Sequence, residues 1–123
     1  MTELTTYKTT TPAEVSKWIA TLPADEFPEN GGLNVKVEDL QIAIFNFTRR
    51  NEWFATQNLC PHKQQMILSR GMIGSDGDEP KVACPFHKKT FSLKTGENLN
   101  GDECPIATYP VKVEGGTVYV GIA

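Results

Sequence analysis

Both histidines and two of the three cysteines in this chain lie in two short motifs, Cys60-Pro61-His62 and Cys84-Pro85-Phe86-His87. Cysteine thiolates and histidine imidazoles are the side chains that bind soft and borderline metal ions. Each motif places one ligand of each type close together, so that both can reach the same small metal centre. The two motifs therefore predict a metal site with two sulfur and two nitrogen ligands.

Two kinds of metal centre use this set of ligands. A Rieske-type 2Fe-2S cluster is held by two cysteines and two histidines, because histidines replace cysteines on one of its irons. A structural zinc site can also take two of each, but its common spacings pair cysteine with cysteine and histidine with histidine. Here each motif is mixed, so we expect a 2Fe-2S cluster bound by Cys60, His62, Cys84 and His87. A zinc-bound or metal-free interaction module is the alternative.

The two motifs must be brought together by the chain between them. Segment 63–83 is long enough for a β-hairpin that folds back and presents the second loop beside the first, and the proline after each cysteine restricts the loop before it binds. Basic residues surround the motifs and could dock an acidic redox partner, or be an ordinary solvated rim: Lys63, Arg70, Lys88 and Lys89. Cys104 has no nearby histidine and is expected to be a free thiol.

Size and charge limit the classes of protein to consider. A chain of 123 residues fits a single domain over residues 1–123, and its net charge of −3 argues against nucleic-acid binding. The run Ile42–Phe45 is too short to cross a membrane, and residues 1–11 show no export signal, so we expect a cytoplasmic protein. The acidic segment Ser75–Glu79 is expected to be a solvated turn, because it lacks the spacing of a calcium loop.

Alternating apolar residues predict an all-β domain. The clearest examples are Leu33, Val35 and Val37, then Ile42 and Ile44 beyond an acidic turn. Further strands are expected at Trp53–Ala55, Lys81–Ala83 and Thr90–Leu93, the last followed by a turn at Lys94-Thr95-Gly96. A hairpin is predicted from Val111 to Val120, because Gly115-Gly116 accepts the positive φ angles of a tight turn.

One segment does not fit this pattern. Thr11-Pro12-Ala13-Glu14 has the spacing of a capping box with proline at the first helical position. Val15, Trp18, Ile19 and Leu22 then recur at helical intervals. From pattern alone, segment 12–20 is predicted to be helical.

Beyond the ligand motifs, several stretches of the chain resemble the small subunit of assimilatory NAD(P)H-dependent nitrite reductase, a Rieske-type 2Fe-2S family. The resemblance covers the chain from about Lys17 to its end and is carried by these stretches: Cys60 to Lys63, Ser69 to Gly74, Val82 to Lys89, Phe91 to Leu93 and Thr95-Gly96. It implies a Rieske-type β-sandwich with a small inserted cluster-binding subdomain at about Asn58–Asn98. It also implies a strand at Lys17–Leu22, which we prefer to the helix because tertiary pairing often overrides local pattern.

The resemblance also implies roles for the ligands and a partner. Cys60 and Cys84 would hold the buried iron, and His62 and His87 the outer iron. The partner would be a large catalytic subunit that carries FAD, siroheme and a 4Fe-4S cluster and reduces nitrite to ammonium with NAD(P)H. This chain has no dinucleotide-binding glycine motif, so it would be an electron-transfer subunit that is not catalytic alone. The alternative is a Rieske ferredoxin that donates electrons to a ring-hydroxylating oxygenase.

The reduction potential can be predicted from the residues after His87. High-potential Rieske proteins carry a serine and a tyrosine there, whose hydroxyl groups donate hydrogen bonds that favour the reduced cluster. Lys89 and Phe91 occupy those positions here. We therefore expect a potential near the lower end of the Rieske range, about −150 mV.

Overall fold

The computed structural model describes residues 9–37, 40–48, 52–60, 65–76, 79–84, 90–99 and 105–122, with the backbone alone for residues 60, 65, 66 and 76. Over these ranges the chain consists of antiparallel strands with three short 3₁₀ turns, so the all-β prediction is confirmed. Within the same ranges, no helix is long and apolar enough to span a membrane.

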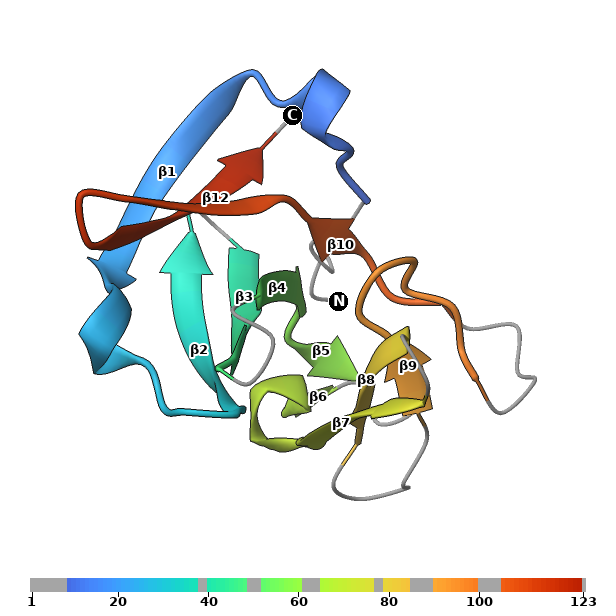
Figure 1. Ribbon diagram of the computed structural model, residues 1–123. Coiled ribbons are helices and arrows are strands. Elements are labelled where there is room, and N and C mark those ends of the chain that lie inside the picture. The colour runs from blue at the N-terminus through green and yellow to red at the C-terminus, as the bar shows by residue number, and fades with distance from the viewer. Residues whose placement is uncertain are drawn as a thin grey trace.

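The described strands form four antiparallel sheets (Figure 1). The first sheet has the order β1 (Lys17–Pro23), β12 (Thr117–Ile122), β11 (Val111–Glu114). The second has the order β10 (Thr108–Tyr109), β4 (Glu52–Gln57), β3 (Leu40–Phe47), β2 (Gly31–Val37). The two smaller sheets are β5 (Leu59–Cys60) with β6 (Gln65–Met66), and β7 (Met72–Asp76), β8 (Glu79–Ala83), β9 (Thr90–Ser92).

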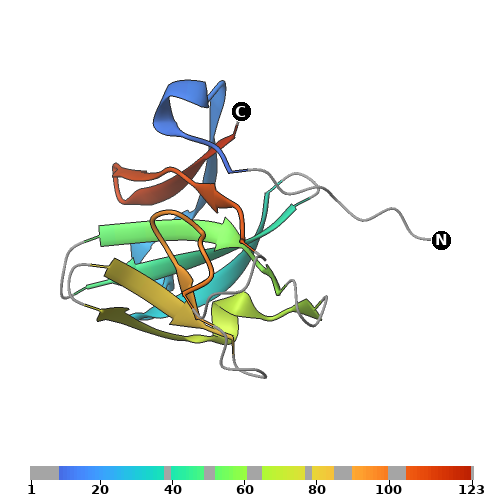
Figure 2. The same ribbon diagram turned by 90° about the vertical axis from the view of Figure 1, so that its right-hand side faces the viewer.

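Strand β3 lies at the centre of the molecule because its two faces enter two different cores. Ile42 and Ile44 join one apolar cluster with Val118 and Val120 of β12. Ala43, Phe45 and Phe47 join the other, which contains residues of β8 and β9. Since neighbouring strand residues point to opposite faces, the four-stranded sheet is the middle of three layers. Figure 2 shows β1, β11 and β12 on one side of it and β7, β8 and β9 on the other.

The N-terminal segment is a single helical turn followed by a strand. Thr11 and Glu14 form the predicted capping contact, because the Thr11 backbone N–H and hydroxyl both donate to Glu14 Oε1 at 2.9 Å. The turn η1 nevertheless ends after Pro12–Glu14, and β1 begins at Lys17. The longer helix is thus wrong, and the strand implied by the family resemblance is confirmed.

The helical spacing in this segment has a physical origin. Strand β1 pairs with β12, but its register shifts between Ala20 and Pro23. Trp18, Ile19, Thr21 and Leu22 are half-buried, whereas Lys17, Ala20 and Pro23 are exposed, so that burial repeats every three residues across the irregularity. A strand with a β-bulge therefore carries an apolar pattern close to that of a helix.

Both turns predicted around the glycines are present. Val113 pairs with Val118 and Glu114 with Thr117, which leaves Gly115 and Gly116 as a two-residue turn with φ of 58° and 81°. At the other turn, Gly96 has a φ of 80° and donates its N–H to Ser92 O at 2.9 Å.

The acidic segment Ser75–Glu79 is mostly strand instead of a solvated turn. Ser75 and Asp76 end β7, and Glu79 begins β8. Glu79 also accepts a hydrogen bond from the buried Ser92 hydroxyl, 2.7 Å from Oγ to Oε2. The prediction of a turn is therefore limited to residues 77 and 78, which lie outside the described residues.

Candidate metal centre

The first ligand motif lies in a hairpin connection. Cys60 pairs with Gln65 and Leu59 with Met66, so the stem of this hairpin is β5 and β6. His62 belongs to residues 61–64 between the two strands and lies outside the described residues, as does the side chain of Cys60. The stem therefore places the Cys60 backbone at the end of β5, directly before residues 61–64.

The second motif also lies between two paired strands. Ala83 of β8 pairs with Thr90 of β9, and Cys84 is the first residue of the connection between them. His87 belongs to residues 85–89, which the structure does not describe. Strand β8 pairs on its other side with β7, from Met72↔Ala83 to Asp76↔Glu79. The hairpin predicted for segment 63–83 is thus the β7–β8 pair.

The Cys84 side chain is buried in an apolar core. It is 1% exposed and clusters with Leu68, Val82, Phe91 and Leu93. An ionised thiolate is costly in such surroundings unless its charge is compensated. A buried thiol at the start of a ligand loop thus fits a metal ligand, because coordination would neutralise the charge.

The stems of the two motifs are connected through one short turn. Asn58 precedes β5, and its carbonyl oxygen accepts a hydrogen bond from Leu68 N at 3.1 Å. Its side-chain Oδ1 accepts a second one from Ser69 N at 2.7 Å. Leu68 and Ser69 begin the turn η3 (Leu68–Arg70), so Asn58 fixes this turn against the base of the first motif.

Gly71 extends the connection to the second motif. Its N–H donates to Leu68 O at 2.9 Å, closing the turn η3. A Cβ atom placed on Gly71 would overlap the carbonyl oxygen of Ala83 and approach Val82 Cγ2 to 2.8 Å. This close approach places the end of η3 directly against the residue before Cys84. The bases of both predicted ligand loops therefore belong to one packed unit.

Gln57 ties the first motif to the middle sheet. Its Nε2 donates to Leu59 O at 2.8 Å, and its Oε1 accepts from Ala107 N at 2.8 Å. Gln57 and Asn58 are both buried. Sequence reasoning missed these two amides and Gly71, although buried polar residues directly before a ligand motif are a usable signal of a supporting role.

The surface beside the second motif combines apolar and basic side chains. Met72 is 81% exposed and pairs with Ala83, while Leu99 is 41% exposed and donates its backbone N–H to Thr90 O at 2.7 Å. Because Ala83 and Thr90 pair with each other, Met72 and Leu99 flank the base of the second ligand loop. Arg70, two residues before Met72, is exposed as well.

The predicted ligands are only partly within the described structure. It places the Cys84 side chain and the Cys60 backbone, whereas His62 and His87 lie outside it, as do Lys63, Lys88, Lys89 and Cys104. Over the described residues, no three Cys, His, Asp or Glu side chains gather as they would around a metal ion. The four-ligand set thus remains a prediction, supported here by two loop stems held together and one buried thiol.

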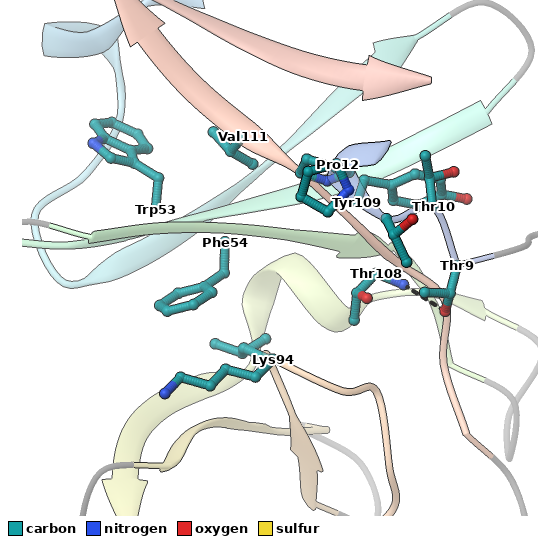
Figure 3. Close-up of a pocket in the computed structure, with 12 residues that line it drawn as sticks. Thr9, Thr10, Pro12, Trp53, Phe54, Lys94, Thr108, Tyr109 and Val111 are labelled. Carbon is teal, nitrogen blue, oxygen red and sulfur yellow. Dashed lines mark hydrogen bonds between the residues drawn. The ribbon is translucent and has the colours of Figure 1, made fainter. Parts of the chain in front are cut away.

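A separate pocket lies where the N-terminal segment meets β10, and Trp53 and Phe54 line it from opposite faces of β4 (Figure 3). Thr108 N donates to Thr9 Oγ1 at 3.2 Å, and Thr10 N donates to Thr108 O at 2.9 Å. The pocket is lined by aromatic, aliphatic and hydroxyl-bearing side chains. Trp53, Phe54 and Tyr109 are its aromatic residues, and Lys94 is its charged residue. The lining residues include no cysteine, histidine or carboxylate, so the pocket supplies no metal ligand.

A known domain family matches most of the chain. The family model of a Rieske-like 2Fe-2S domain aligns with residues 17–121. This range begins at β1 and includes both ligand motifs and all the described strands except the last residue of β12.

Individual relatives fall into two groups. The solution structure of a nitrite reductase NAD(P)H small subunit from Erwinia carotovora has a TM-score of 0.75 and 31% identity, covering 88% of this chain and 83% of that chain. A nitrite reductase NAD(P)H large subunit from Klebsiella oxytoca is 36% identical over 104 residues, 85% of this chain but 11% of that protein. The ferredoxin component of a naphthalene 1,2-dioxygenase system from Pseudomonas aeruginosa is 35% identical over 108 residues, 87% of this chain and 97% of that protein.

The lengths of these relatives differ greatly from that of this chain. This chain spans only 10% to 13% of the length of the nitrite reductases from Klebsiella oxytoca, Emericella nidulans and Neurospora crassa. The matching region is therefore one module of those larger proteins, whereas it is nearly the whole of the ferredoxin component.

Proposed function

We propose a function from one premise, that this chain belongs to the family of Rieske-like 2Fe-2S domains. A bound centre of this type accepts and releases a single electron. Cys60 and Cys84 would supply the two thiolates, and His62 and His87 the two imidazoles. The observation that carries the proposal is the pair of hairpin stems, β5–β6 and β8–β9, joined through Asn58, η3 and Gly71 at the bases of both motifs.

The described residues around the motifs would hold and insulate such a centre. Leu68, Val82 and Phe91 surround the Cys84 thiol with apolar atoms, which excludes water from that side. The hydrogen bonds of Asn58 and Gln57 fix the first stem before any metal binds. Loops that are held in place lose less conformational entropy on binding a metal, so the fold favours loading.

The biological role that we infer is the electron-transfer subunit of NAD(P)H-dependent nitrite reductase. Its partner would be the large catalytic subunit, with FAD, siroheme and a 4Fe-4S cluster, which reduces nitrite to ammonium during nitrate assimilation in the cytoplasm. The chain would not be catalytic alone. Two comparisons support this role: the likeness to the Erwinia carotovora small subunit, which covers 88% of this chain and 83% of that chain, and the related segment within the Klebsiella oxytoca large subunit.

The second candidate is a Rieske ferredoxin for a ring-hydroxylating oxygenase. The similarity to the naphthalene dioxygenase ferredoxin component, which extends over 97% of that protein, favours it. Both candidates have the same fold and the same chemistry and differ in the partner that is reduced or oxidised.

The partner would dock where the second ligand loop begins. Met72 and Leu99 offer exposed apolar contacts there, and Arg70 adds a positive charge on a protein whose net charge is −3. Lys63, Lys88 and Lys89, adjacent to the ligands in sequence, would extend the basic rim. Opposite charges across an interface speed association and make its rate sensitive to salt.

Two experiments test these proposals separately. Substitution of Cys60, His62, Cys84 or His87 by Ala should abolish the visible absorption and the bound iron, whereas the matched control Cys104→Ala should keep both. Electron transfer is then measured between the loaded wild-type protein and either a nitrite reductase large subunit or an oxygenase component with its reductase. Electron transfer with the large subunit but not with the oxygenase supports the nitrite role. Electron transfer with the oxygenase but not with the large subunit overturns it.

A further inference from the structure

Asn58 has an unused hydrogen-bonding group next to the first ligand motif. The residue is 0% exposed and stands two positions before Cys60. Its backbone N–H donates to Gln41 O at 2.9 Å, its carbonyl accepts from Leu68 N, and its Oδ1 accepts from Ser69 N. Its side-chain Nδ2, by contrast, has no hydrogen-bond partner among the described residues and is buried.

A buried amide donor without an acceptor destabilises the folded state by about 1–3 kcal/mol. Such groups are rare in folded proteins and need an explanation, of which a bound cofactor is one. The amide cannot turn around to remove the cost, because exchanging Oδ1 and Nδ2 would point a donor at the Ser69 N–H. The orientation of the side chain is thus fixed by η3, and its two N–H donors are fixed with it.

We propose that Asn58 is a positioning residue for the metal centre, and that its Nδ2 donates a hydrogen bond to a sulfur of the bound cluster or of its Cys60 ligand. The inference rests on the proposed 2Fe-2S function. A sulfur is the acceptor that the chemistry favours, because it carries negative charge and because hydrogen bonds to charged acceptors are about twice as strong as neutral ones. The donor sits on the residue that also fixes the base of the second loop through η3.

The electronic consequence follows from the charge on the cluster. Reduction adds one electron, so a donor aimed at sulfur stabilises the reduced form more than the oxidised form. The usual hydroxyl donors are replaced here by Lys89 and Phe91, which leaves the Asn58 amide as a donor that would raise an otherwise low potential. Removing it should lower the potential further.

The test compares two neutral substitutions at neighbouring buried amides in the loaded protein. Asn58→Leu removes the donor without adding charge, and we expect the reduction equilibrium to shift about tenfold toward the oxidised form, which is 59 mV for a one-electron couple. Gln57→Leu also removes two hydrogen bonds near the first motif, but both partners of Gln57 are backbone groups. It should destabilise the fold with little change in potential.

Equal potentials in wild type and Asn58→Leu, or equal shifts in both variants, would overturn the proposal and leave Asn58 a purely structural residue. If Asn58→Leu does not fold, the measurement on isotopically labelled wild-type protein described next decides the proposal.

A second measurement needs no variant. In wild-type protein labelled with ¹⁵N at asparagine, pulsed electron paramagnetic resonance of the reduced form should show a nitrogen coupled to the cluster, and its absence contradicts the hydrogen bond. A wild-type protein that binds no iron would instead reject the proposed function.

Discussion

At the scale of single residues, the electronic properties of the centre depend on which donors surround it. Phe91 is 0% exposed and belongs to the same apolar cluster as Cys84. A phenylalanine at this position adds apolar surface without a hydroxyl donor. The prediction of a potential near about −150 mV, at the lower end of the Rieske range, rests on this difference.

Phe91→Tyr should therefore raise the potential, because a hydroxyl near the cluster stabilises the added electron. We expect an upward shift of several tens of millivolts, roughly the effect of one hydrogen bond of about 1 kcal/mol. Protein-film voltammetry of both proteins measures it. Met66→Leu, which changes no hydrogen-bonding group, is the control. A potential that stays the same or falls in Phe91→Tyr would show that position 91 does not face the centre.

Gly71 holds the two loop bases together, so a side chain there should disturb them. Gly71→Ala would force a methyl group against Ala83 O and Val82. We expect a loss of about 2 kcal/mol or more in the free energy of unfolding, as for other overpacked sites, together with weaker retention of iron. At Gly74 in β7, an added Cβ atom meets no atom within 4 Å, so Gly74→Ala should change little. Urea denaturation separates the two, and similar losses in both variants would argue against a special role for Gly71.

At the scale of elements, the strands with regular alternation were predictable and those with interruptions were not. Strands β2, β3 and β12 follow from their apolar residues, because one or both faces are buried without a break. Strand β11 follows from its alternation, although its Val113 is exposed. Strands β5, β6 and β10 have only two residues each, too few to show a period. The β-bulge in β1 gives a helical spacing to a strand, which only pairing with β12 resolves.

The β11–β12 hairpin shows an element whose turn follows directly from two residues. Gly116 has a φ of 81°, which a residue with a Cβ atom adopts only at a cost of roughly 1–2 kcal/mol. Gly116→Ala should therefore lower the free energy of unfolding by about that amount. Gly115→Asn should be neutral within about 0.5 kcal/mol, because Asn-Gly is a favoured pair in turns of this type. Thermal unfolding monitored by circular dichroism tests both, and the opposite ranking would contradict the turn geometry.

At the candidate site, the sequence predicts four ligands, which stay a prediction, but not the residues that support their loops. Cysteine and histidine at short spacing indicate the ligand chemistry. Asn58, Gln57 and Gly71 act through a hydrogen-bond direction or a close backbone approach, and neither is encoded in residue type or periodicity. Their roles emerge only when Ser69, Leu59 and Ala83 are placed in space.

At the scale of the whole molecule, one apolar core supports the sheet framework and the other supports the candidate metal site. The core between β12 and the middle sheet includes Phe27, Ile42 and Tyr109 and, among the side chains that the structure describes, none from β5 to β9. The other core depends on Leu68, Val82, Cys84 and Phe91, which belong to the segment that carries the motifs. Metal binding should therefore stabilise one layer more than the others.

Removal of iron with a chelator under reducing conditions should expose this difference. We expect amide protons of β7, β8 and β9 to lose protection against hydrogen exchange by tenfold or more, while those of β1, β11 and β12 change little, because β8 and β9 contribute to the core that contains Cys84, whereas β1, β11 and β12 pack on the other core. Hydrogen-exchange mass spectrometry measures each segment. Equal loss across all strands would mean that the cores are coupled, and no loss anywhere would mean that the centre does not support the fold.

The central claim is that this chain binds a 2Fe-2S cluster through two mixed cysteine–histidine loops. Its most direct test is metal and sulfide analysis of protein purified without air and without reconstitution, combined with electron paramagnetic resonance after reduction. The account predicts about two irons and two acid-labile sulfides per chain, with the spectrum of a mixed-ligand cluster. One zinc per chain without sulfide, or no bound metal at all, would contradict it.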